Sequence, residues 1–145
     1  MSFTFNPTAI EKEYQLIKTD ERWPSSDDAE KTMIKVRIAN TGDVASRDDM
    51  FSTLKREISS EQPDVVTLVS VVSTAKLRML EARLTLSSCN ILDEDGKPYF
   101  EFTNEGRIKN DSAFNKAWNK LPALVTDEIS QYVRETNEQW KAQGE

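Results

Sequence analysis

The longest apolar segment of the chain lies at its centre and predicts a long helix. It begins with the β-branched stretch VVTLVSVV, which could form a strand by propensity alone, and continues as TAKLRMLEARLTL over residues 74–86. On one continuous helix the polar residues fall on a narrow strip, and apolar residues occupy the remaining wide arc. This strip comprises Thr67, Ser70, Thr74, Arg78, Glu81, Thr85 and Ser88. So wide an apolar arc is expected at the centre of a domain or against a partner.

A strict alternation of apolar and charged residues predicts a strand in the segment MIKVRIAN, residues 33–40. One side of this strand carries Ile34, Val36 and Ile38, and the other side carries Lys35 and Arg37. A lone strand leaves its backbone groups unpaired and therefore needs neighbours. The aromatic segments Phe3–Phe5 and Tyr99–Phe102 are the candidates for pairing.

Apolar residues at helical spacing predict four further helices. Their expected ranges are Thr8–Lys18, Arg47–Ser59, Ser112–Asn119 and Pro122–Lys141. A capping box precedes or opens each of the first two, and Pro122 separates the last two because proline cannot donate a hydrogen bond inside a helix. The predicted fold is α+β and mainly α-helical, with about four to five helices and a small sheet of two or three short strands.

The polar segment TDERWPSSDDAEKT predicts an exposed acidic loop over residues 19–32 of a single domain that covers residues 1–145. Trp23 is the one apolar feature of this loop. Either its ring anchors the loop to the core, or it contacts a partner.

The segment LDEDGKP predicts a tight turn around Gly96. Asp93 and Asp95 are interpreted as turn formers. An EF-hand with Gly96 at its sixth position would place Ile91 and Phe102 at its first and twelfth positions. Neither side chain can bind calcium, so this motif is excluded.

Composition restricts the classes of function. A net charge of −6 and a pI near 4.8 argue against nucleic acid as a partner, because most nucleic-acid affinity comes from neutralising phosphates. The N-terminal segment lacks the pattern of a signal peptide, and charged residues interrupt the longest apolar run before it could span a bilayer. We expect a soluble protein without membrane contact, located in the cytoplasm, or in the host cytoplasm if a phage encodes it.

The residue types that commonly carry catalysis are scarce. There is no histidine, no glycine-rich phosphate loop, and a single cysteine, Cys89, which is interpreted as a buried thiol. Glu81 is the only acid in the middle of the central helix, and a surface ion pair with Arg78 is its expected role. We therefore expect no enzymatic activity, no cofactor and no metal site.

Five residues are candidates for contact with a protein partner. Lys76 and Arg83, seven positions apart, fall inside the apolar arc of the central helix. Their side chains could extend from the edge of the core into solvent, or they could form a basic pair that receives an acidic partner. Together with the aromatic residues outside the predicted helices, the candidates are Phe3, Phe5, Trp23, Lys76 and Arg83.

The segment LEARLTLSSCNILDEDGKPYFEF, residues 80–102, resembles a pattern in the tail assembly chaperones of long-tailed bacteriophages. Members of that family commonly show a VR-containing strand, a helix, and a second helix that runs into an aspartate-rich DEDGKP-type turn, followed by a closing amphipathic helix. The matching parts of this chain are IKVRIANTGDV, the helix around Met50–Ile58, the turn Asp93–Phe100 and the helix from Pro122. The resemblance covers about Ile34 to Trp140, and the FTFNP segment and the acidic loop lie outside it.

The resemblance implies a non-catalytic protein that binds the tape measure protein and helps to recruit tail tube subunits during tail assembly. It also implies self-association into a homo-oligomer. The alternative is a structural or adaptor subunit that self-associates and stays in the phage particle.

Overall fold

The computed structural model describes residues 2–6, 10–24, 30–50 and 66–143, with the side chains of 66–73 and 142–143 excepted. Its elements are β1 (Glu11–Gln15), α1 (Ile17–Arg22), β2 (Met33–Arg37), a helix that includes residues 41–50, α3 (Val66–Thr85), β3 (Leu86–Cys89), α4 (Asp111–Lys120), α5 (Ala123–Thr136) and the 3-10 helix η3 (Glu138–Gln143). The prediction of a mainly helical α+β fold with a small sheet is confirmed.

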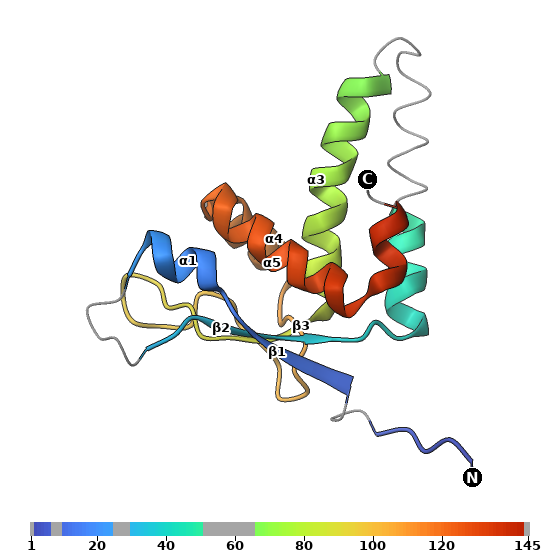
Figure 1. Cartoon of the computed structure of the whole chain (residues 1–145), viewed down its shortest axis with the longest axis horizontal. Helices are drawn as coiled ribbons and strands as arrows, with labels where there is room; N and C mark the ends of the chain where they lie inside the picture. Colours follow the sequence, from blue (N-terminus) through green and yellow to red (C-terminus); the bar gives the residue numbers. More distant parts are fainter. Residues whose placement is uncertain (1, 7–9, 25–29, 51–65, 144–145) are drawn as a thin grey trace.

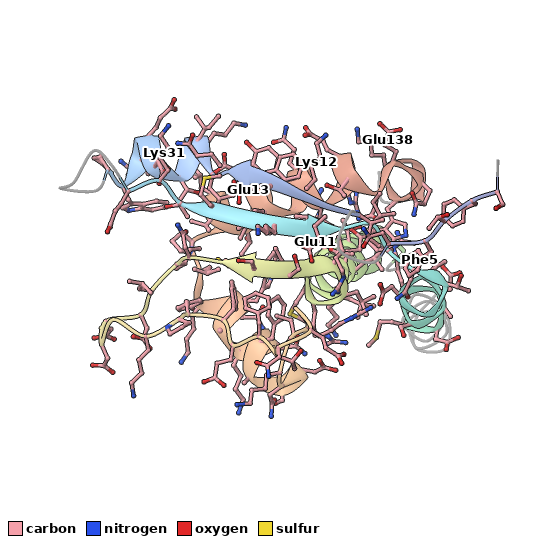
Figure 2. All side chains as sticks on the ribbon, turned by 90° about the horizontal axis from the view of Figure 1, so that it is seen from below. Phe5, Glu11, Lys12, Glu13, Lys31 and Glu138 are labelled. Atoms are coloured by element: carbon pink, nitrogen blue, oxygen red, sulfur yellow. The ribbon has the colours of Figure 1, made fainter. Side chains whose placement is uncertain are left out.

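The three strands form an antiparallel sheet in the order β1-β2-β3. The helices lie on one face of this sheet, and α3 extends away from it (Figure 1). Figure 2 shows the opposite face, with the strands in front of the helices. On β2 the alternation acts as predicted, since Ile34 and Val36 are buried against the helices while Lys35 is exposed on the opposite face.

Two residues depart from the predicted alternation of β2. Arg37 is buried, because its guanidinium donates hydrogen bonds to the carbonyl oxygens of Gly106 and Leu84, which lie beside this end of the sheet. Ile38 follows the last residue of the strand and is 48% exposed. Whether a residue at the end of a strand is buried therefore depends on the segments that pack over it, and not on the alternation alone.

The predicted neighbours of β2 were wrong. The predicted helix over Thr8–Lys18 was wrong for Glu11–Gln15, and its first two residues lie outside the described part of the chain. Glu11–Gln15 forms β1 and pairs with β2, and the second neighbour is β3. Pairing is favoured because Tyr14 lies opposite Ile34, stacks on Tyr132 with ring centroids 4.5 Å apart, and bonds through its hydroxyl to Thr136 at 2.8 Å. These tertiary contacts outweigh the local helix-entry signals. In the described part of the chain, Phe3–Phe5 and Tyr99–Phe102 form no strand, and of these residues Phe102 makes only an isolated bridge.

The hydrophobic core lies between the sheet and the helices. It combines residues from β2, β3, α3, α4, α5 and η3 with two residues from connecting segments. Its members are Leu16, Ile34, Val36, Ala82, Leu86, Phe100, Phe114, Trp118, Val125, Ile129, Val133 and Trp140. Phe114 contacts both Phe100 and Trp118, with ring centroids 4.8 and 5.7 Å apart. This aromatic cluster fixes α4 against the segment that follows the DEDGKP turn.

Three helix boundaries differ from the predicted ones. The helix at residues 41–50 begins at residue 41, not at Arg47, because the side chains of Asn40 and Asp43 each accept a hydrogen bond from the other's backbone N–H. The predicted end of this helix, at Ser59, lies outside the described residues. The central helix ends at Thr85, because the next residues pair with β2. The break at Pro122 is confirmed.

The third boundary is the end of α5, at Thr136 and not at Lys141. Asn137 is fully buried, accepts a hydrogen bond from the N–H of Ala39 at 2.7 Å and donates to the carbonyl oxygen of Arg37 at 3.1 Å. Its side chain thereby supplies hydrogen-bond partners for backbone groups at and after the end of β2, and α5 ends where it contacts this segment. The remainder of the predicted helix forms η3.

The predicted exposed loop over residues 19–32 was wrong for its first four positions, which are part of α1. Thr19 is buried, because its N–H and hydroxyl both donate to a carboxylate oxygen of Glu128 at 2.9 and 2.8 Å. The N–H of Lys18 donates to the second carboxylate oxygen at 2.8 Å. A buried acid on α5 thus caps the first turn of α1, a contact that joins residues about 110 positions apart.

A buried ion cluster joins four helical segments. Glu81 is 1% exposed and accepts hydrogen bonds from Nε of Arg47 at 2.8 Å and Nε of Arg134 at 3.0 Å. The guanidinium of Arg47 also lies 5.1 Å from the ring centroid of Trp140. The predicted surface ion pair of Glu81 with Arg78 is therefore wrong. The polar strip of the central helix faces inward at Glu81, because two arginines from other segments supply its partners.

The DEDGKP turn has the predicted chemistry. The side chain of Asp93 accepts hydrogen bonds from the N–H groups of Asp95 and Lys97, both at 2.9 Å. Gly96 has a φ of 78°, a conformation that L side chains rarely adopt. Asp93 is thus a turn former, as the sequence indicates.

Candidate functional site

Two surfaces of the described chain carry exposed apolar side chains. The first is the N-terminal arm, residues 2–6, which has no regular secondary structure. Phe3 is 89% exposed and Phe5 is 60% exposed. Figure 1 shows the arm extending away from the sheet and the helices. Both phenylalanines were predicted partner-binding residues, and their exposure leaves them available for such contacts.

The second surface is an open groove of about 840 Å³, called here the Trp23 groove. Its apolar lining is formed by Trp23, Met33, Ile91, Leu92, Leu121 and Val125. Trp23 is 47% exposed and Leu92 is 60% exposed, whereas Val125 is buried. Polar side chains, among them Glu30 and Lys31, also line the groove. Its size lies within the range of roughly 300–1,000 Å³ typical of ligand clefts.

Hydrogen bonds fix the walls of the Trp23 groove. Asp20 accepts hydrogen bonds from the hydroxyl of Thr32 at 2.6 Å and from Gln15 at 3.1 Å. Asn90 accepts a hydrogen bond from the N–H of Met33 and donates one to the carbonyl oxygen of Lys31, both at 2.8 Å. The groove is therefore held in place by side chains on both of its sides.

The charge of Asp20 strengthens one of these walls. Partial burial raises the pKa of Asp20, but the hydrogen bonds from Thr32 and Gln15 lower it by more, so the pKa lies below its ordinary value. Asp20 therefore remains ionised at neutral pH and keeps its hydrogen bonds to both segments.

The predicted basic pair, Lys76 and Arg83, lies on α3, and neither residue lines the Trp23 groove. Lys76 is exposed on α3. Arg83 is only 15% exposed; its Nε lies 3.7 Å from a carboxylate oxygen of Asp111, and its Nη1 donates to Asn115 at 3.0 Å. Arg83 therefore links α3 to α4, and of the pair Lys76 is the more accessible to a partner.

Of the groove residues, sequence reasoning identified only Trp23. Leu92 directly precedes the DEDGKP turn, where helical periodicity gives no signal, and Leu121 follows the helical spacing of Phe114 and Trp118, which predicts packing and not a groove. The groove joins segments about 30 to 100 positions apart along the chain. An apolar residue directly before a polar turn was the one available hint for Leu92.

Two further observations concern the described residues alone. They contain no cluster of three or more aspartate, glutamate or cysteine side chains that could hold a metal ion. None of the helices in the described ranges combines the length and apolar character needed to cross a membrane.

Alkylation of Cys89 by iodoacetamide at pH 8 is expected to be about one hundred times slower in the native protein than in the urea-denatured chain. Burial raises the pKa of the thiol from 9.0 to about 11, which lowers the fraction of reactive thiolate at pH 8 by about two orders of magnitude. Mass spectrometry of timed samples measures both rates on the same residue, because the chain has one cysteine. Cys89 is half-buried, and equal rates would contradict the effect of this burial on the pKa of its thiol.

The chain was compared with protein families, curated proteins and solved structures, and none of them matches it.

Proposed function

We propose that this protein is a non-catalytic chaperone of phage tail assembly, which binds the tape measure protein and helps to bring tail tube subunits to it. The observation that carries the proposal is the grouping of exposed apolar side chains in the Trp23 groove. Single exposed apolar residues are normal on a soluble protein. An apolar groove with a polar rim is instead typical of a surface that binds another protein.

A helical partner fits this surface chemically. An amphipathic helix binds a groove by inserting apolar side chains at i, i+3 or i+4, and i+7 spacing. A tape measure protein is long, helical and prone to aggregate, and therefore offers many such anchors. Glu30 and Lys31 supply both signs of charge at the groove for the polar flank of such a helix.

The charge of the chain suits a chaperone. A net charge of −6 keeps complexes with an aggregation-prone partner apart from one another and so favours solubility. The specific assignment to tail assembly rests on the resemblance of residues 80–102 and the order of elements around them. The groove supports the more general part of the proposal, which is protein binding.

Co-expression with a tape measure protein is expected to keep that protein soluble. The double variant Trp23→Ser/Leu92→Ser is expected to reduce its soluble recovery at least about fivefold, because both exposed anchors of the groove are lost. Ile38→Ser is the matched control, since Ile38 is 48% exposed, like Trp23, but does not line the groove. Equal recovery with all three forms would contradict binding through the groove.

The exposed arm favours a second candidate, a self-associating adaptor subunit of the particle. Purified particles distinguish the two functions. A chaperone is absent from the finished particle, whereas an adaptor is present in a fixed ratio to the other structural proteins. Quantitative mass spectrometry of purified particles measures this ratio directly.

A further inference from the structure

The two exposed apolar surfaces lie at opposite ends of the domain. Phe5 and Lys31, which belong to the arm and to the lining of the Trp23 groove, are far apart along the sheet (Figure 2). We propose that the N-terminal arm of one copy binds in the Trp23 groove of a second copy, so that copies associate head to tail. This self-association needs no other protein and goes beyond the proposed chaperone function, but it uses the same groove, so an arm and a helical partner would compete for it.

The arm has the pattern of a segment that binds along a groove. Phe3 and Phe5 are separated by one residue, so in an extended arm both rings project to the same side, roughly 7 Å apart. Thr4 then points to the opposite side, toward solvent. Exposing two phenylalanines next to each other on a short arm is unfavourable unless another surface covers them.

The Trp23 groove offers matching chemistry. Trp23 and Leu92 belong to separate segments, and both are exposed at the groove. Val125 is part of the core, and Ile91 packs against it. Two phenyl rings would contact apolar side chains there, and one could pack against the indole of Trp23. The arm carries no charged side chain over residues 2–6, so its burial desolvates no ionised side chain.

The arm points away from the groove of its own chain. Residue 10 lies at one end of the β1–β2 ladder, where its carbonyl oxygen accepts a hydrogen bond from Ile38, and the groove residue Met33 lies at the other end, opposite Gln15. Five residues of strand separate the two ends, about 17 Å. The arm extends outward from the Ile10 end (Figure 1). A second copy is therefore the occupant that the arrangement favours.

This contact has a definite consequence for assembly. Because the arm and the groove are different surfaces, the interface is heterologous, and each bound pair retains one unused arm and one unused groove. Association therefore continues beyond a dimer, either to a closed ring or to an open chain. With two aromatic anchors for each contact, we expect a dissociation constant on the order of 100 µM.

Analytical ultracentrifugation of the full chain between about 10 µM and 1 mM tests the proposal. The average mass of the native protein is expected to rise with concentration and to exceed that of a dimer. An arm variant, Phe3→Ser/Phe5→Ser, and a groove variant, Trp23→Ser/Leu92→Ser, are each expected to remain monomeric. Thr4→Ala and Ile38→Ser serve as matched controls, in the arm and on the surface outside the groove, and should associate like the native protein.

An equimolar mixture of the two variants gives the decisive measurement. The groove variant retains its arm and the arm variant retains its groove, so the mixture is expected to form a dimer and nothing larger. A monomeric native protein, association of the arm variant alone, or a mixture that stays monomeric would each overturn the proposal. Circular dichroism verifies that the variants fold; if the groove variant does not, Leu92→Ser alone, at a 60% exposed position, replaces it in the mixture.

Discussion

Replacing Glu81 by alanine is expected to lower the free energy of unfolding by about 3–5 kcal/mol. The substitution leaves Arg47 and Arg134 buried without the carboxylate that now accepts a hydrogen bond from each of them. Removing one partner of a buried ion pair is costly because the remaining charge stays out of water. The loss would be a large share of the 5–15 kcal/mol that typically stabilises a domain. Urea unfolding followed by circular dichroism measures it.

The control for Glu81→Ala is Glu135→Ala, which makes the same change at an exposed position of α5. It is expected to alter the free energy of unfolding by less than about 0.5 kcal/mol. Replacing the whole cluster by methionine, at residues 47, 81 and 134 together, is expected to recover most of the lost stability, since no buried charge then lacks a partner. A loss below 1 kcal/mol for Glu81→Ala would show that the cluster is not a major source of stability.

Replacing Glu128 by alanine is expected to cost roughly 2–4 kcal/mol. The buried carboxylate accepts hydrogen bonds from the N–H of Lys18 and from both the N–H and the hydroxyl of Thr19. Without it, the two buried donors of Thr19 lack a partner, and the N–H of Lys18 loses one at a partly buried position. Because α1 leads directly to Trp23, the same change is expected to loosen one wall of the Trp23 groove.

Hydrogen exchange separates this local effect from a general loss of stability. The amides of Lys18 and Thr19 are expected to exchange faster in Glu128→Ala than in the native protein, under conditions where the amides of β2 keep their protection. Asp127→Ala is the matched control, because Asp127 is adjacent but 68% exposed. Unchanged exchange at the start of α1 would contradict the capping role of Glu128.

Local patterns predicted the elements whose burial follows a simple period. The alternation in residues 33–37 corresponds to β2, and the helical spacing on either side of Pro122 corresponds to α4 and α5. In these elements the apolar side of the pattern is also the side that packs against the core. Local preference and tertiary packing therefore agree, and the sequence suffices.

Prediction failed where a long-range contact opposed a local preference. Helix-entry signals preceded Glu11–Gln15, yet this segment is a strand because Tyr14 packs against Tyr132 and β2 supplies its backbone partners. Intrinsic propensities differ by only about 1 kcal/mol or less for ordinary residues. A few packed side chains and a ladder of hydrogen bonds outweigh a difference of that size.

The candidate site was predictable only in part, for a related reason. Exposed aromatic residues outside the periodic segments identified Phe3, Phe5 and Trp23 as available for contacts. The other apolar walls of the Trp23 groove come from turns and helix ends that are distant in the sequence, such as Leu92 and Leu121. No local pattern relates these positions to Trp23, because only the packing of α1, α4 and α5 brings them together.

The sequence by itself determined the fold class, the strand at the centre of the sheet, the proline break and the turn chemistry of Asp93 and Gly96. Each depends on side chains within a few positions of one another. The tertiary structure alone decided that Glu81 and Glu128 are buried, because a carboxylate is buried only where hydrogen-bond donors from distant segments lie beside it. Those donors lie 34 to 110 positions away, a separation that local periodicity does not encode.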